Sequence, residues 1–196
     1  MINLELKVRD PDPAATAARC AEIGARDLGV LHQRDTYFDV AMGRLKLRED
    51  LDTGDAELIA YRREALEGVR ASAYERARLD QPERIAELLR ASVGVVGVVE
   101  KIRRLFLYEH VRIHLDDVQR LGAFVELEAV QDGVAAAPDE DVTLAWLMRA
   151  LDLETRQPIA TGYLELLTVG VPPRTDHVST AIVHRKASAP TGAESE

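Results

Sequence analysis

Phe124-Val125-Glu126-Leu127-Glu128 alternates apolar and acidic side chains along the chain. The same alternation opens the sequence, in Asn3-Leu4-Glu5-Leu6-Lys7-Val8. Because successive side chains of a β-strand point to opposite faces, each stretch predicts a strand with one charged face and one aliphatic face. The direction of the charged faces, toward water or toward an enclosed interior, therefore decides the fold.

Further segments between these two alternate in the same way, namely Arg44–Arg48, Glu100–Arg103 and Val111–Asp116. Glycines at 43, 54, 68 and 122 supply turns between strands, as in a mostly antiparallel sheet. A charged face of a single strand usually points to solvent. Here, however, acidic pairs fall on the first and last strands and basic pairs on those between, whereas solvated faces usually mix both signs. This segregation favours a closed barrel with a charged lumen, although the pattern alone leaves both orientations open.

Four helices are predicted, over 14–23, 82–91, 139–151 and 162–167. The first has Asp12-Pro13 before it and Gly24 after it, which are typical start and stop residues. In the inverted arrangement, the first three helices would cover outward-facing aliphatic side chains. Val171-Pro172-Pro173 begins a tail rich in Pro, Ser and Thr. We therefore expect one domain over 1–170 and a flexible extension over 171–196.

The totals exclude several classes of protein. The chain has 196 residues and a net charge of −9, which argues against a protein that coats a nucleic-acid backbone. No apolar run reaches the roughly 18 residues of a membrane-spanning helix, and no secretory signal is visible at the N-terminus. The single cysteine, Cys20, cannot form an internal disulfide. A cytoplasmic protein without a membrane or nucleic-acid partner is the expectation.

Six segments, in order, resemble the motifs of a known family, the CYTH domains or triphosphate tunnel metalloenzymes. They are Asn3-Leu4-Glu5-Leu6-Lys7, Gln33–Asp39, Leu45–Glu49, Lys101-Ile102-Arg103, the block from Leu115-Asp116 through Leu121-Gly122 to Phe124–Glu128, and Tyr163–Leu167. Each motif is weak alone, but six in the right order are specific. The resemblance implies an α+β fold: a mostly antiparallel closed β-barrel with a charged lumen, covered by outer helices.

The resemblance also implies a divalent metal ion, Mg²⁺ or Mn²⁺, and a set of site residues. The expected metal ligands are Glu5, Glu126 and Glu128, since carboxylates at i and i+2 of a strand share a face. The expected substrate-binding cations are Lys46, Arg48, Arg62, Lys101, Arg103 and Arg112, of which Arg62 has an uncertain direction beside Arg63. The expected catalytic residues are Lys7, Lys101 and Arg103. Asp116 shares a face with Arg112 and His114, so it could orient an arginine.

Two departures from the family pattern bear on function. Asn3 stands where the family has a glutamate, which weakens the case for a second metal ion, and Ser72-Ala73-Tyr74 stands where many members have Arg-x-Glu. His110 and His114 are about 13 Å apart on a strand, so they would not share a metal and are expected to be ordinary partly buried histidines.

The implied activity is metal-dependent turnover of a triphosphate, first as an adenylate cyclase-like enzyme that converts ATP to cyclic AMP and pyrophosphate. Alternatives are a hydrolase of tripolyphosphate or thiamine triphosphate, and a triphosphate or polyphosphate sensor without catalysis. A further alternative is an interaction domain, whose outer aliphatic faces could support a homodimer.

Overall fold

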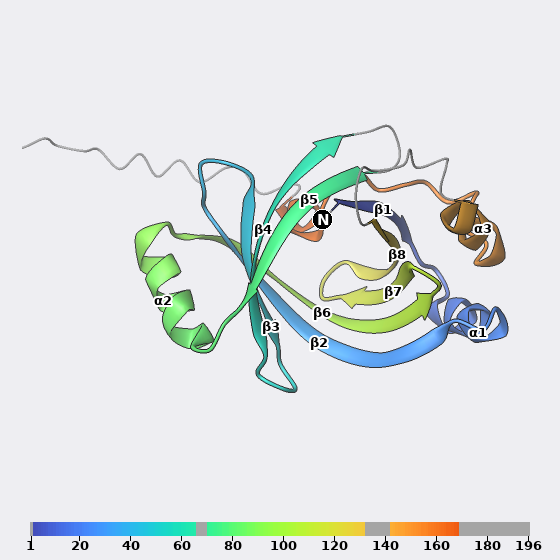
Figure 1. Cartoon of the computed structure of the whole chain (residues 1–196), viewed down its shortest axis with the longest axis horizontal. Coiled ribbons are helices and arrows are strands. Elements are labelled where there is room, and N and C mark those ends of the chain that lie inside the picture. The colour runs from blue at the N-terminus through green and yellow to red at the C-terminus, as the bar shows by residue number, and fades with distance from the viewer. Residues whose placement is uncertain (1, 66–69, 132–141, 169–196) are drawn as a thin grey trace, which may run out of the picture.

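A computed structural model describes residues 2–65, 70–131 and 142–168, and Figure 1 shows how their helices and strands are arranged. The antiparallel strands follow the order β1-β5-β4-β3-β2-β6-β7-β8. Because β1 pairs with both β5 and β8, the strands form a closed barrel. The predicted α+β fold is confirmed. The strands are β1 (Ile2–Arg9), β2 (Arg26–Phe38), β3 (Arg44–Asp50), β4 (Ala56–Ala65), β5 (Arg70–Arg78), β6 (Val95–Tyr108), β7 (Val111–Val118) and β8 (Gly122–Gln131).

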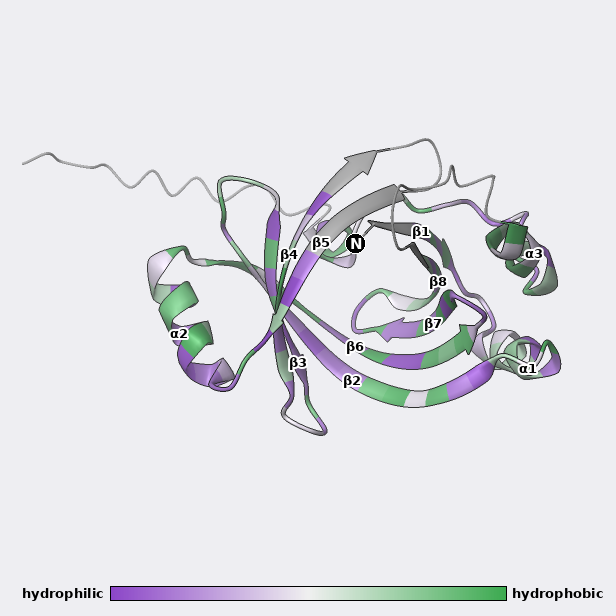
Figure 2. Ribbon diagram, in the orientation of Figure 1, coloured by the Kyte–Doolittle hydropathy of each residue, from purple (hydrophilic) through white to green (hydrophobic). Residues whose placement is uncertain are grey.

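The charged faces of the strands point into the barrel. On β6, Lys101 and Arg103 are each 6% exposed, whereas Ile102 between them is 48% exposed. This is the reverse of an ordinary alternating strand, whose apolar face is the buried one. Figure 2 shows hydrophilic and hydrophobic bands along β2 and β6. The inverted orientation, with charges inward, is therefore the one that this chain adopts.

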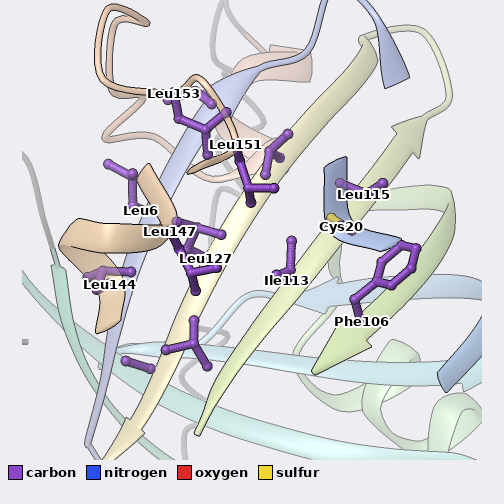
Figure 3. Packing of buried hydrophobic residues seen from close by; sticks show 14 residues of the cluster. Leu6, Cys20, Phe106, Ile113, Leu115, Leu127, Leu144, Leu147, Leu151 and Leu153 are labelled. Atoms are coloured by element: carbon purple, nitrogen blue, oxygen red, sulfur yellow. The ribbon is translucent and has the colours of Figure 1, made fainter. Parts of the chain in front are cut away.

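Two helices cover the outer aliphatic face of β1, β6, β7 and β8. They are α1 (Pro13–Glu22), which Asp12 caps by accepting a hydrogen bond from the backbone N–H of Ala15, and α3 (Val142–Ala150). Figure 3 shows the cluster between the helices and the strands, in which Leu144 and Leu147 of α3 lie among the outward side chains of the barrel. The burial of these leucines holds the helices on the outer surface.

The third predicted helix, α2 (Pro82–Ser92), covers another part of the barrel. Its Ala86 packs against Leu47 of β3 and Phe38 of β2, which both point outward. No described helix covers the outer face of β2 and β6 where Val30 and Ile102 lie, and these two side chains stay about half exposed. The three outer helices therefore cover much of the barrel, as predicted, but not this side.

A fourth short helix, α4 (Tyr163–Thr168), packs into one end of the barrel. Its Tyr163 and Leu164 form a buried cluster with lumen-facing residues that include Tyr61 and Phe124. Leu164 lies over Gly97 of β6, where a Cβ atom would be 2.6 Å from its Cδ1. The helix thus approaches the strand closely because residue 97 has no side chain.

The remaining expectations concern parts of the chain at the margins. The beginning of the predicted helix 139–151 and the extension 171–196 lie outside the described residues, so the division at residue 170 stays a prediction. Within 2–65, 70–131 and 142–168, no helix has the length and apolar character needed to cross a membrane.

Candidate functional site

The lumen of the barrel is a cavity of about 740 Å³ to which every strand contributes. This volume falls within the range of about 300–1,000 Å³ that is usual for small-molecule sites. Unlike most such sites, it is dominated by charge. The charged lining residues, among which His114 also lies, are Glu5, Lys7, Asp35, Lys46, Arg48, Asp50, Asp55, Glu57, Arg76, Arg78, Asp80, Lys101, Arg103, Arg112, Glu126 and Glu128.

Asp35 of β2 fixes two of the lumen cations. It is 2% exposed and lies opposite Arg48 in the β2–β3 register. Arg48 donates through Nε and Nη2 to its two oxygens at 2.7 and 2.8 Å, and Lys46 Nζ donates to Oδ2 at 2.9 Å. Burial raises the pKa of Asp35, but Arg48 and Lys46 outweigh burial and hold this pKa well below its usual range. Asp35 therefore stays ionised and orients both cations.

Asp116 of β7 does the same for a second pair. Arg103 donates to its two oxygens at 2.6 and 2.5 Å, and Lys101 Nζ lies 3.5 Å from Oδ2. Tyr163 of α4 adds a third donor, at 3.0 Å from Oδ2. Burial raises the pKa of Asp116, but Arg103 and Lys101 lower it by more, so that the pKa is about 2. The expectation that Asp116 orients an arginine is confirmed, and that arginine is Arg103 rather than Arg112.

The aspartates offset only part of the cost of burying the charges of Lys46 and Lys101. Burial and the neighbouring Arg48 lower the pKa of Lys46 to about 7. Burial and the neighbouring Arg103 lower the pKa of Lys101 to about 8. An ammonium group in such a place lacks water and faces a like charge, so it gives up its proton readily. An anion bound in the lumen would raise the pKa of both lysines, because it places an opposite charge beside them.

We therefore expect tripolyphosphate binding to take up protons at alkaline pH. At pH 8, Lys46 is mostly neutral in the free protein and Lys101 about half so, and an anion that raises both pKa values would draw in about one proton or more. Because the free lysines lose their charge as pH rises through about 7 and 8, affinity should fall over that range. Titration calorimetry at pH 8 in buffers of different ionisation heat measures the uptake. The Lys46→Met variant should take up less, and equal heats in all buffers would contradict the expectation.

The opposite wall of the lumen carries the acidic residues. Glu126 of β8 accepts from Lys7 Nζ at 2.9 Å and from Arg103 Nη2 at 2.7 Å. Burial raises the pKa of Glu126, but Lys7 and other neighbours hold it well below its usual range. Glu128 lies 3.4 Å from Arg112 Nη1, and the β1–β8 register puts Glu5 opposite it. The three predicted metal ligands thus come from adjoining strands and face one cavity.

These residues suit a divalent cation in part. Carboxylate oxygens are the donors that Mg²⁺ and Mn²⁺ prefer. His114 of β7 adds a nitrogen donor among them, since its Nδ1 is buried without a hydrogen-bond partner. Within the described residues, no three such side chains already converge closely enough to form a preformed metal site. The donor set therefore fits one metal ion, provided that the carboxylates turn from the cations that they now contact.

Most of the predicted site residues lie together. Glu5, Lys7, Lys46, Arg48, Lys101, Arg103, Arg112, Glu126 and Glu128 all line the cavity. Arg62 does not line it. Its strand neighbour Tyr61 points inward instead, and Arg62 is exposed on the other face, so its predicted place in the lumen was wrong. His110 is also exposed, whereas His114 is 5% exposed inside the barrel, so neither is the partly buried histidine that was expected.

Several lumen residues were not predicted from the sequence. Asp35 was part of a motif but had no predicted role, although its position two residues after Gln33 puts both side chains on one face of the strand. Arg76 and Arg78 of β5 line the cavity and were not considered. Their own i, i+2 spacing was the available signal. Tyr163 reaches Asp116 from 47 residues away, and nothing in the local pattern could have indicated this contact.

Comparisons with known proteins agree with this geometry. A family model described as "CYTH domain" matches residues 1–163. A Methanocaldococcus jannaschii protein whose curated name is "putative adenylate cyclase" is 23% identical over 175 residues, which cover 85% of this chain and 98% of the relative.

Solved structures share the fold. A protein of Pyrococcus horikoshii is 24% identical, with a TM-score of 0.73 over 84% of this chain and 98% of its own. A Hippeastrum protein, described as a "putative adenylyl cyclase" with "a dominant" triphosphatase activity, is 15% identical, with a TM-score of 0.62 over 86% of this chain and 95% of its own.

Proposed function

The chain belongs to the CYTH domain family, and from this premise we propose that its lumen binds the phosphate chain of an organic triphosphate and turns it over with the help of a divalent metal ion. The leading substrate is ATP, with an adenylate cyclase-like reaction. The observation that carries the proposal is the pair of buried aspartates, each of which holds an arginine and a lysine toward one cavity.

The four cations supply what a phosphate chain requires. A triphosphate carries about four negative charges, and binding it away from water needs several charge-assisted hydrogen bonds. Arg48 and Arg103 present planar guanidinium groups that can contact two oxygens at once. Because their aspartates already fix them, little conformational freedom is lost when substrate binds. The same fixed charges would stabilise the negative charge that develops on the leaving pyrophosphate.

The acidic wall would hold the metal ion, as Mg²⁺ or Mn²⁺. Glu126 and Glu128 are the main ligands in this proposal, and Glu5 faces Glu128 in the β1–β8 register. A bound divalent ion neutralises phosphate charge and polarises the phosphorus that is attacked. Lys7, which contacts Glu126 at 2.9 Å, would hold that carboxylate in place and, with the metal ion bound, would contact the substrate instead.

Apolar residues in the cavity favour an organic triphosphate over an inorganic one. Leu28, Leu31 and Leu105 are among the residues that line it. Apolar side chains of this kind can contact a nucleobase, whereas inorganic tripolyphosphate has no group to offer them. With the base there, the ribose 3′-hydroxyl would attack the α-phosphorus and lose its proton to water. A P–O bond would form to O3′, and the bond to pyrophosphate would break.

Hydrolysis is the second candidate. The cations that bind the phosphates do not themselves choose between a ribose hydroxyl and a water molecule as nucleophile. The activity described for the Hippeastrum relative makes a triphosphatase the natural comparison. Tripolyphosphate and thiamine triphosphate are the substrates that this alternative predicts. A triphosphate sensor without turnover would use the same cations, and the cytoplasm is the proposed location in each case.

The test is a product analysis. The purified full-length protein is incubated separately with ATP, tripolyphosphate and thiamine triphosphate, with Mg²⁺ or Mn²⁺, and every product is identified. Cyclic AMP plus pyrophosphate from ATP is expected. Orthophosphate as the main product would replace the cyclase proposal by the hydrolase, and tight binding without turnover would replace both by the sensor. Neither binding nor turnover of any of the three would overturn the proposal as a whole.

A further inference from the structure

His114 occupies a place in the lumen that its neighbours do not explain. Its side chain points inward from β7 and is 5% exposed. Nδ1 has no hydrogen-bond partner and lies 3.6 Å from Glu126 Oε2. Nε2 lies 3.6 Å from Glu128 Oε2. Each distance is too long for a hydrogen bond, so the imidazole lies between two carboxylates without a close bond to either.

A neutral imidazole cannot satisfy both carboxylates. It has one N–H to donate, and its other nitrogen carries a lone pair. If Nε2 carries the hydrogen and faces Glu128, the Nδ1 lone pair faces another anionic oxygen, that of Glu126. Two electron-rich atoms at this separation in a buried place are unfavourable unless a cation lies between them. Arg103 Nη2 already contacts Glu126 Oε2 at 2.7 Å, but His114 Nδ1 has no partner of its own, so its lone pair beside a carboxylate is a place where a further cation would bind.

We propose that His114 Nδ1 is a ligand of the divalent metal ion together with Glu126, and that this nitrogen makes the site prefer Mn²⁺ to Mg²⁺. The proposal deepens the metal dependence in the proposed function and rests on it. Metal–nitrogen and metal–oxygen bonds are each about 2.0–2.2 Å long, so two donors 3.6 Å apart can share one ion. Imidazole suits transition-metal ions, whereas Mg²⁺ favours oxygen donors alone.

Glu128 has a matching role in this arrangement. A metal-bound histidine usually donates its second N–H to a carboxylate, which fixes the ring and strengthens the bond to the metal. The Nε2 atom of His114 faces Glu128 Oε2, so this oxygen of Glu128 would orient the histidine. The backbone register supports the grouping, since β7 and β8 place His114 directly opposite Glu126.

The test uses Mn²⁺ alone, without any triphosphate, so its outcome does not depend on which reaction the protein performs. Electron spin echo spectroscopy of the Mn²⁺-loaded full-length protein should show modulation from a directly bound nitrogen. The His114→Gln variant should lose this modulation and bind Mn²⁺ at least about tenfold more weakly, because even an outer-shell partner is usually worth about 10–100-fold in metal affinity. Mg²⁺ binding should change much less.

Two further variants make the result decisive. His32→Gln is the matched control, because His32 lies on the outer face of β2 beside Asp52 and is 44% exposed; it should leave both affinities and the modulation unchanged. His114→Asp keeps a short polar donor in the lumen, so it should bind metal, lose the nitrogen modulation and shift the preference toward Mg²⁺. Nitrogen modulation that persists in His114→Gln, or is absent from the unaltered protein, would overturn the proposal. Loss of Mg²⁺ and Mn²⁺ affinity to the same extent in His114→Gln would do so too.

Discussion

Replacing Glu126 by glutamine is expected to lower turnover of the triphosphate substrate by about 10²–10³-fold, the range typical for loss of one preorganised electrostatic contact. Glu126 contacts Lys7 and Arg103 and lies beside His114, so its charge acts on the metal site and the substrate cations together. Glutamine has nearly the same shape but no charge. The backbone and the Arg103–Asp116 pair should therefore persist while metal affinity and turnover fall.

Glu100→Gln provides the control for the loss of a glutamate as such. Glu100 lies on the outer face of β6, where it accepts a hydrogen bond from Arg34 at 2.7 Å. Steady-state rates and the metal concentration at half-maximal rate should match those of the unaltered protein. The Glu126→Gln protein must fold normally, as judged by circular dichroism. If its rate then stays within about tenfold of the unaltered rate, a change of about 1.4 kcal/mol in the activation free energy, Glu126 is not part of the site.

The direction of the charged faces was open from the strand pattern and was settled by the family resemblance. Period-two alternation places Glu5 with Lys7, and Glu126 with Glu128, on one face. It does not say which side of the sheet is enclosed, because the same pattern suits a solvated face. The clearest physical sign was that β3, β6 and β8 each carry a pair of like charges on one face, which is unfavourable on exposed strands unless a ligand or an opposite wall compensates.

Contacts that depend on strand register or on distant segments could not be predicted from the local sequence pattern. Asp35 meets Arg48 only because β2 and β3 pair in one particular register, and a shift of one residue would turn either side chain to the other face. The prediction for Arg62 was wrong for a related reason. Adjacent side chains in a strand point to opposite faces, and the sequence did not show which face Arg62 takes. Tyr163 lies on a short helix whose position depends on packing in the barrel end, so its contact with Asp116 had no signal in the sequence.

His114 shows a different kind of failure. The spacing of four residues from His110 led to the expectation that the two histidines would not share a metal ion. The prediction of two ordinary, partly buried histidines was wrong. His114 lies two residues from both Arg112 and Asp116, so it shares their inward face with the lumen charges. Considering which face a residue shares, rather than which residue of its own type is nearby, would have placed it in the site.

Asp116→Asn is expected to lower the free energy of unfolding by about 3–5 kcal/mol, the usual cost of removing one partner of a buried ion pair. The substitution leaves Arg103, which is 6% exposed, without its main counter-charge. Denaturant unfolding, followed by circular dichroism, measures the loss. Asp117→Asn is the matched control, since the next residue along β7 is exposed on the outer face, and its effect should stay within about 0.5 kcal/mol.

The pH dependence separates loss of charge from loss of packing at Asp116. The folded-state pKa of Asp116, about 2, is below the value of about 3.9 for an unfolded chain. Its ionised form therefore contributes stability that is fully present above about pH 4 and is lost as pH falls toward 2, roughly 2–3 kcal/mol in all. The difference in unfolding free energy between the unaltered protein and Asp116→Asn should accordingly narrow over that interval. A difference that stays constant from pH 5 to pH 2 would mean that Asp116 acts through its shape and hydrogen bonds and not through its charge.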